Sequence, residues 1–156
     1  MVNLEAARAR LASLPDPEIP AVTLVELGIV RDLRETGAGL EVVLTPTYSG
    51  CPATELIADD VRAALAEFGP VTVTLQRSPA WTTDWISAEG REKLQRYGIV
   101  PPQCSAEQAI RFVPQLRCPR CAGGRTEQLS RFGSTPCKST WRCIECGEPF
   151  EYFKSI

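Results

Sequence analysis

Hydrophobic and polar residues alternate with two different periods in the first part of the 156-residue chain, and each period predicts one type of element. Residues 29–34 and 40–44 alternate as strands do, and the Thr-Gly-Ala-Gly sequence between them is typical of a hairpin. Residues 71–75 alternate in the same way and predict a third strand. An N-terminal helix that ends before Pro15 is predicted by leucines near helical spacing, at positions 4, 11 and 14.

Three further helices are predicted, and the clearest of them begins directly after Pro52. The sequence Thr-Leu-Val-Glu at 23–26 has the pattern of a capping box and predicts a short helix, and residues 87–98 predict the last helix. This order of elements predicts an α+β fold, a small mixed β-sheet packed with helices. The residues expected on the apolar face of the clearest helix are Leu56, Ile57, Val61, Ala64, Leu65 and Phe68.

Two Cys-x-x-Cys pairs dominate the C-terminal part of the chain: Cys118, Cys121, Cys143 and Cys146. Structural zinc takes four tetrahedral ligands, and one tight Cys-x-x-Cys turn can supply two of them. Strand-prone segments at 127–132, 139–142 and 149–153 lie between and after the pairs. A segment of roughly 40 residues needs such a staple to fold. We therefore expect a small zinc-ribbon-like β domain with four cysteine ligands, although the same spacing would permit an iron–sulfur cluster.

The charge balance changes along the chain and indicates two domains. Residues 1–111 carry 10 basic and 15 acidic side chains, a balance of −5, whereas residues 112–156 carry 7 and 4, a balance of +3. Gly and Pro residues near position 100 mark a boundary. We expect domains at 1–98 and 114–156 with a linker at 99–113. Because four thiolates on Zn²⁺ would lower the second balance to about +1, nucleic acid is not an expected partner.

The chain has seven cysteines, no histidine and a formal net charge of −2. Without histidine there is no Ser-His-Asp triad, no Cys-His pair and no di-iron site of the Glu-x-x-His type. A transition metal must then be bound by thiolates or carboxylates. No run of 18 apolar residues predicts a membrane span, and the N-terminus lacks an apolar signal core. We expect a cytoplasmic protein, in which a disulfide framework is disfavoured.

Cys51 precedes Pro52 at the predicted start of the clearest helix. Proline favours the first helical position, which would place Cys51 at the N-cap, where the helix dipole stabilises a thiolate. A nucleophilic thiol would need a base that the missing histidine cannot provide, whereas metal binding needs only the thiolate. Hydroxyls of the preceding loop, Thr47 among them, could line such a site. The alternative is a buried thiol that only packs at the helix start.

The sequence Asp-Pro-Glu-Ile-Pro at 16–20 predicts a rigid acidic turn. Asp16 or Glu18 could approach Cys51 in the fold and complete a mixed carboxylate–thiolate site. The alternative is a solvated loop between two elements.

Trp81 and Trp85 flank a Thr-Thr-Asp sequence after the third strand. Large aromatic side chains of this kind either pack in a core or anchor a protein partner, and both alternatives stay open.

Two cysteines, Cys104 and Cys137, have no assigned role, and for Cys137 a buried thiol is favoured over a fifth ligand.

These motifs together resemble a known family. The acidic turn, the strand pair and the Thr-Pro-Thr-Tyr-Ser-Gly-Cys-Pro sequence at 45–52 look like the metal–sulfur cluster assembly domain of SufT-like proteins. With its cysteine tail, nearly the whole chain resembles the D subunits of bacterial phenylacetyl-CoA epoxidase systems, the PaaD family. The further matching segments are Trp-Thr-Thr-Asp-Trp-Ile-Ser at 81–87, Tyr-Gly-Ile-Val-Pro-Pro at 97–102, Phe-Gly-Ser-Thr at 132–135 and Pro-Phe-Glu-Tyr-Phe-Lys at 149–154.

The resemblance implies an accessory factor, not an enzyme, that assists iron or iron–sulfur assembly in a phenylacetyl-CoA epoxidase during aerobic phenylacetate degradation. It implies that Cys51 transiently holds iron or a cluster, beside Asp16 and Glu18. The implied partners are the oxygenase and the iron–sulfur reductase components, and a homodimer is left open. Two alternatives compete with this hypothesis: a structural adaptor of the oxygenase complex, and a zinc-ribbon protein that binds nucleic acid.

Overall fold

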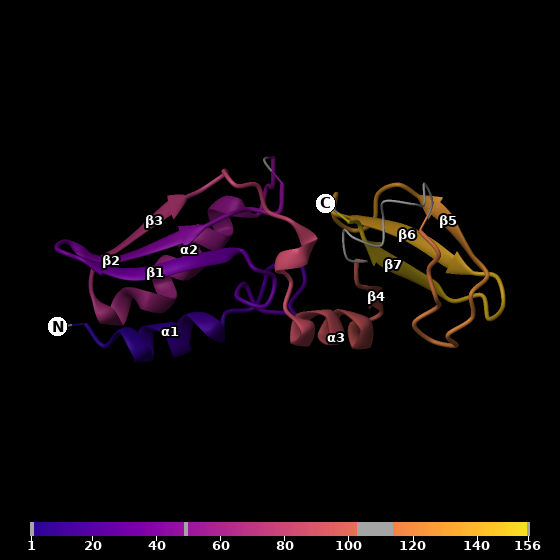
Figure 1. The fold of residues 1–156 in the computed structure, drawn as a ribbon, viewed down its shortest axis with the longest axis horizontal. Helices are drawn as coiled ribbons and strands as arrows, with labels where there is room; N and C mark the ends of the chain where they lie inside the picture. Colours follow the sequence, from indigo (N-terminus) through magenta and orange to yellow (C-terminus); the bar gives the residue numbers. More distant parts are fainter. Residues whose placement is uncertain (1, 49, 103–113, 156) are drawn as a thin grey trace. The chain divides into compact units, whose positions relative to one another are not determined.

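The computed structural model describes residues 2–48, 50–102 and 114–155, and the chain forms two compact units (Figure 1). The first unit extends to Trp81 and the second begins at Thr82. Each unit has its own β-sheet, so each is described by itself. Within the described ranges, no helix combines the length and the apolar character that crossing a membrane requires.

The sheet of the first unit has the strand order β1-β2-β3. Strands β1 and β2 form the predicted antiparallel hairpin, and β3 pairs with β2 in parallel after the chain has passed through α2. Helices α1 and α2 contact each other, while α1 also contacts β1 and α2 also contacts β3, so both helices lie on one face. The elements are α1 (Leu4–Ala12), β1 (Val30–Thr36), β2 (Gly39–Leu44), α2 (Thr54–Leu65), a 3₁₀ turn η1 (Ala66–Phe68) and β3 (Val71–Leu75).

The core of the first unit lies between the central strand and the helices. Leu40, Val42 and Leu44 of β2 are almost fully buried, as are Val61 and Leu65 of α2. The predicted helix face is confirmed except at two positions. Leu56 is 52% exposed, and Ala58 lies on the buried face instead. Phe68 lies beyond the end of the helix and is half-buried.

The capping box at 23–26 forms, but the short helix predicted after it does not. The Thr23 N–H donates to Glu26 Oε2 at 2.8 Å, and the Glu26 N–H donates to Thr23 Oγ1 at 3.2 Å. The backbone then makes a single turn that ends at Gly28, whose φ of 74° suits glycine. The helix prediction is wrong because Leu24 and Leu27 are buried on this turn and the chain must enter β1 directly afterwards.

The second unit contains a helix and a four-stranded sheet of order β4-β7-β6-β5. Helix α3 lies within the predicted range 87–98, and both of its ends are capped: Ser87 Oγ accepts the Gly90 N–H, and Gly98 is left-handed with a φ of 91°. The strands β5, β6 and β7 confirm the three predicted segments of the ribbon. The elements are η2 (Thr83–Trp85), α3 (Ala88–Tyr97), β4 (Ile99–Val100), β5 (Thr126–Ser130), β6 (Lys138–Cys143) and β7 (Pro149–Phe153).

The chain divides at a different place from the predicted linker at 99–113. Ile99 and Val100 form β4, which pairs in parallel with β7, so these two residues belong to the ribbon sheet. The contacts also group α3 with the ribbon, although it was expected in the domain at 1–98. Gly98 ends the helix and lets the chain enter a strand at once, which is why a boundary was predicted there. Residues 103–113, with Cys104, lie outside the described residues.

Gly39 at the start of β2 provides a test of the first sheet. Its φ is 131°, and a Cβ there would overlap the Pro70 carbonyl oxygen, which accepts the Leu40 N–H at 2.8 Å. Gly39→Ala is expected to lower the free energy of unfolding of this unit by about 1–3 kcal/mol. Gly37→Ala is the matched control, because open space surrounds Gly37. Amide exchange of β1 and β2 in urea measures both variants, and equal losses would contradict the assignment.

Candidate metal centre

Two turns bring the four predicted cysteines of the second unit together. The sulfurs of Cys118, Cys121, Cys143 and Cys146 all lie within 4.8 Å of one another. The distance from Cys118 Sγ to Cys146 Sγ is 3.7 Å, and that from Cys121 Sγ to Cys143 Sγ is 3.6 Å. Four sulfurs at about 2.3 Å from a tetrahedral Zn²⁺ are about 3.8 Å apart. The donor set and its spacing therefore fit a single tetrahedral metal ion.

The first turn, residues 118–123, is closed by backbone hydrogen bonds around Cys118. The Cys118 N–H donates to the Gly123 carbonyl, and the Ala122 N–H donates to the Cys118 carbonyl, both at 2.9 Å. Two further amides point at sulfur: Arg120 N–H donates to Cys118 Sγ, and Gly123 N–H donates to Cys121 Sγ, both at 3.4 Å. The backbone thus fixes both sulfurs of the pair.

The second turn, residues 143–148, repeats this pattern. The Cys143 N–H donates to the Glu148 carbonyl, and the Gly147 N–H donates to the Cys143 carbonyl, again at 2.9 Å. The residue after each second cysteine is left-handed, with φ of 61° at Ala122 and 77° at Gly147. The two turns are therefore structural equivalents, as expected for a ribbon in which each turn supplies two ligands.

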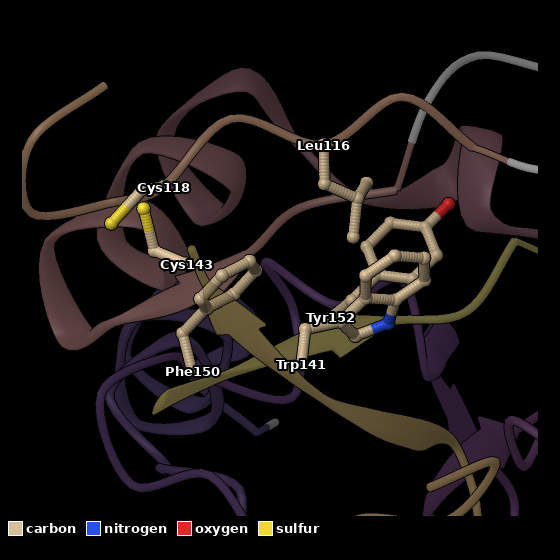
Figure 2. Packing of buried hydrophobic residues seen from close by; sticks show 6 residues of the cluster. All are labelled: Leu116, Cys118, Trp141, Cys143, Phe150 and Tyr152. Carbon is tan, nitrogen blue, oxygen red and sulfur yellow. The ribbon is translucent and has the colours of Figure 1, made fainter. Parts of the chain in front are cut away.

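One sulfur of each turn belongs to the hydrophobic core of the ribbon. Cys118 and Cys143 are buried, whereas Cys121 and Cys146 are exposed. Figure 2 shows the Cys118 and Cys143 side chains close together beside Phe150. The same cluster contains Leu116 and an edge-to-face pair, Trp141 and Tyr152, with ring centroids 6.5 Å apart. The metal ligands and the core are thus one packing unit.

The close packing of the sulfurs changes the pKa values of Cys118, Cys121 and Cys146. Burial would raise the pKa of Cys118, but N–H donors of Cys121 and Arg120 lower that pKa to about 7. The Gly123 N–H lowers the pKa of Cys121, but the neighbouring sulfurs and burial together raise that pKa to about 12. The pKa of Cys146 is raised as well: the Glu148 N–H and the Cys121 thiol lower it, but burial together with the Cys118 and Cys143 sulfurs outweighs them. Four thiolates so close require a cation, and a bound divalent metal deprotonates its thiols.

The predicted buried state of Cys137 is confirmed. Its side chain is 5% exposed, and its sulfur lies 3.0 Å from Thr135 Oγ1. It is not a member of the four-sulfur group. All cysteines of the described ranges are free of disulfides.

Cys51 lies before α2, but not at its N-cap. The helix begins at Thr54 with Ala53 as the N-cap residue, two positions later than expected. The backbone at Cys51 is fixed from both sides: its N–H donates to the Tyr48 carbonyl, and its carbonyl accepts the Thr54 N–H, both at 3.2 Å. The side chain is half-buried. The prediction of an N-cap cysteine is wrong because the Cys-Pro pair occupies a separate turn ahead of the helix.

Asp16 is buried, 5% exposed, so the alternative of a solvated loop is wrong for it. Its Oδ1 accepts the N–H groups of Glu18 at 2.9 Å and Ile19 at 2.8 Å, and so the carboxylate shapes the turn. Glu18 is half-buried. In the described part of the chain, the four C-terminal cysteines are the one set of three or more thiols and carboxylates close enough to share an ion. Asp16, Glu18 and Cys51 do not form such a set.

Thr45 and Thr47 are two of the loop hydroxyls that were expected to line a site beside Cys51. Thr45 is 1% exposed, and its Oγ1 has no hydrogen-bond partner in the described structure, while its N–H donates to the Ile29 carbonyl at 2.8 Å. Thr47 is half-buried.

The two tryptophans differ in their environment. Trp81 is 3% exposed, and its indole N–H donates to the Leu27 carbonyl at 2.8 Å. It packs in the core, and the partner-anchor alternative is wrong for it. Trp85 is half-buried, so that alternative stays a prediction there.

Two family models match separate parts of the chain. The model described as an iron–sulfur cluster assembly protein matches residues 4–75, which contain Cys51 and the acidic turn. The model described as the PaaD zinc beta ribbon domain matches residues 102–154, which contain the four clustered cysteines. The half-buried thiol and the four-sulfur site therefore fall in two distinct domains.

The chain is similar to named proteins and to a solved structure. A protein of Escherichia coli (strain K12), provisionally named as the D component of 1,2-phenylacetyl-CoA epoxidase, is 50% identical over 153 residues, 95% of this chain and 90% of its own. The Fe-S protein maturation auxiliary factor YitW of Bacillus subtilis (strain 168) is 37% identical over 58% of this chain and 83% of its own. A crystal structure of a DUF59 domain from Bacillus anthracis, 27% identical, covers 58% of this chain and 89% of its own with a TM-score of 0.53.

The equivalence of the two cysteine turns can be tested at their left-handed residues. Ala122→Gly is expected to raise the free energy of unfolding of the zinc-loaded second unit by roughly 0.5–1 kcal/mol, because it removes the strain of a side chain at positive φ. Open space surrounds Gly147, so Gly147→Ala introduces the same backbone strain without a steric overlap. This variant is expected to lower the free energy of unfolding by a similar amount. Thermal unfolding at saturating zinc measures both. Shifts of the same sign in the two variants would show that the turns are not equivalent.

Proposed function

This chain belongs to the PaaD family, the D subunits of phenylacetyl-CoA epoxidase systems, and from that membership we propose that it is a maturation factor of such an epoxidase. It assists the assembly of iron or of an iron–sulfur cluster in the oxygenase or the reductase component. Iron is then the cargo that the chain delivers, and the chain itself performs no turnover of phenylacetyl-CoA. The observation that carries this proposal is a half-buried free thiol on a fixed turn, within a region that matches a cluster-assembly family.

Cys51 and three further residues have different roles in the proposed handling of iron. Cys51 provides the thiolate, and the two backbone hydrogen bonds at this residue fix the position from which its side chain extends. Asp16 acts as a positioning residue, because its Oδ1 is occupied with the amides of its own turn. Glu18 and Thr47 remain candidates for a second contact with the cargo. Transfer is favoured by a ligand set that is incomplete in this chain, since a client can then supply the missing ligands.

The absent histidine supports metal handling over bond-breaking chemistry at Cys51. A cysteine nucleophile needs a neighbouring base, and the sequence offers no imidazole for this purpose. A soft metal such as iron in a sulfide cluster needs only the thiolate. The relatives named as Fe-S protein maturation factors support the same interpretation.

We assign one structural Zn²⁺ to the four-cysteine site. In a cluster the thiolates bind different irons, so ligands of different irons lie farther apart than ligands of one ion. The sulfurs here lie within 4.8 Å of one another, which supports a mononuclear site. Cys118, Cys121, Cys143 and Cys146 would all act as thiolate ligands, and the ion would stabilise the folded ribbon.

A second function, a structural adaptor in the oxygenase complex, is favoured by one observation. The Escherichia coli relative is named as a subunit of the epoxidase, not as a maturation factor. In that case the chain would stay bound to the active complex at a fixed stoichiometry, and Cys51 would be dispensable.

Replacing Cys51 tests the maturation role. Cys51→Ser, co-expressed with the epoxidase components in a strain that lacks the native chain, is expected to leave the client component with several-fold less iron. The reason is that a hydroxyl does not replace the thiolate as a soft ligand. Cys137→Ser is the matched control, because that thiol is buried outside both sites. Full iron loading with Cys51→Ser would refute metal transfer.

Metal analysis tests the assignment of the ribbon. Anaerobically purified chain is expected to contain one zinc and no acid-labile sulfide, and Cys121→Ser is expected to lose the zinc because one of four ligands is missing. Cys51→Ser should retain it. Equal amounts of iron and acid-labile sulfide, about two or four of each per chain and lost on Cys121→Ser, would instead show a cluster in this site.

A further inference from the structure

An exposed phenylalanine stands on the loop that connects β5 to β6 in the second unit. Phe132 is 63% exposed. Its backbone is nevertheless fixed on both sides, because its N–H donates to Ser130 Oγ and its carbonyl accepts from Thr140 Oγ1, each at 3.2 Å. The ring is therefore displayed by an ordered backbone and adds nothing to the core.

An ion pair between a buried lysine and a half-buried glutamate positions this loop. The Lys138 side chain is 3% exposed, and its Nζ lies 2.8 Å from Glu151 Oε2 and donates to Ser134 Oγ at 2.7 Å. The second carboxylate oxygen of Glu151 accepts the Ser134 N–H at 2.6 Å. Although burial would raise the pKa of Glu151, Lys138 and Ser134 lower it. The Glu151 carboxylate thus connects β6 and β7 to the loop that follows Phe132.

Gly133 leaves the space that this arrangement requires. A Cβ there would lie 2.6 Å from Glu151 Oε1 and 3.2 Å from Lys138 Cβ. The Gly133 N–H also donates to the Lys138 carbonyl at 2.7 Å. The loop therefore approaches the ion pair so closely that a side chain at position 133 would require the Glu151 carboxylate to move.

A use for the displayed ring would explain why the chain keeps this arrangement. Burying the Lys138 ammonium beside the half-buried Glu151 carries a desolvation penalty that their attraction often fails to recover, so the pair is weak evidence for stability, and a fixed loop geometry explains it better. Aromatic side chains on preorganised backbones are the typical anchors of protein interfaces, because little conformational entropy is lost on binding. Phe132 has both properties.

The charge around Phe132 is positive. Lys154 Nζ lies 4.7 Å from the centre of the Phe132 ring and donates to the Arg131 carbonyl at 3.1 Å. Arg131 is exposed beside it. Lys138 balances the charge of Glu151. Glu151 therefore does not balance the two positive charges that Arg131 and Lys154 present. A surface with this pattern is complementary to carboxylates.

The neighbouring edge of the sheet extends the apolar surface. Strand β5 is the last strand in the sheet order, and Leu129 on it is 53% exposed at an irregularity in the pairing with β6. A bulge at a sheet edge hinders the addition of another strand. The edge therefore favours a partner that contacts side chains over one that extends the sheet.

We propose that Phe132, with Arg131 and Lys154 beside it, is the docking point for an acidic segment of a protein partner that buries an apolar side chain against the Phe132 ring. The identity of the partner, a component of the epoxidase system, rests on the proposed function. Nucleic acid would also contact an aromatic ring flanked by cations. The acidic balance of the whole chain, −2, and the charge of a zinc–thiolate site favour protein.

The binding of the zinc-loaded full chain to purified oxygenase and reductase components tests this surface. Phe132→Ser is expected to weaken binding to one component about tenfold or more, as for other aromatic anchors. Arg131→Glu should weaken it too, and wild-type binding should weaken as salt is raised. Tyr97→Ser, 58% exposed on α3 of the same unit, is the control and should bind as wild type. Zinc content and thermal unfolding show that each variant is folded.

Equal affinity of wild type and Phe132→Ser for both components, or binding by neither component, would overturn the proposal. Binding of a single-stranded oligonucleotide that Phe132→Ser abolishes, without binding of a component, would also overturn it and assign the surface to nucleic acid. The Cys51→Ser variant distinguishes this result from failure of the proposed function. If Cys51→Ser permits full iron loading while Phe132→Ser loses binding, metal transfer is refuted and the docking surface stands.

Discussion

The convergence of four cysteine sulfurs is the constraint on which the second unit depends. Cys118 and Cys143 belong to its core, so the geometry of the sulfurs and the packing of Trp141 and Phe150 cannot be separated. Four thiolates within 4.8 Å repel one another strongly without a cation, and a divalent ion converts that repulsion into a link between two distant turns. Because β7 also pairs with β4, this link extends through the sheet to the end of α3.

The first unit is stabilised in another way, by the packing of aliphatic side chains without a cysteine. Its central strand β2 is buried between two neighbours, and the buried face of α2 covers it with aliphatic side chains such as Val61 and Leu65. Among the residues described for this unit, none of the buried core side chains carries a sulfur. The core of this unit therefore does not include the Cys51 sulfur, whereas the core of the second unit includes the Cys118 sulfur. The two kinds of thiol thus differ in whether they belong to a hydrophobic core.

The sequence predicted what depends on local chemistry and short spacing. The hairpin turn at 36–39, the two ends of α3 and the cysteine pairs are each determined by a few adjacent residues, and all appear in the structure. Errors arose where tertiary contacts outweigh a local signal. Thr23 and Glu26 form a capping box without a helix, because buried leucines end the turn. The composition of the segment around Ile99 and Val100 is typical of a linker, but both residues pair with strand β7. The role of Asp16 as a buried acceptor was likewise not predictable, because a carboxylate between two prolines usually remains in solvent.

The position of Cys51 two residues ahead of the helix has a physical consequence for its proposed role. At the N-cap, the side chain would compete for the first free amides of α2, and its orientation would follow the helix axis. In the observed turn Cys51 contacts the helix start through its backbone only: its carbonyl accepts the N–H of Thr54, the first helical residue, and its own N–H donates to the Tyr48 carbonyl. The backbone at Cys51 is thus hydrogen-bonded on both sides, while the half-buried sulfur is not engaged as a cap. This combination suits the proposed acceptance and release of a metal, since a sulfur bound into a cap would have to break that contact in each transfer.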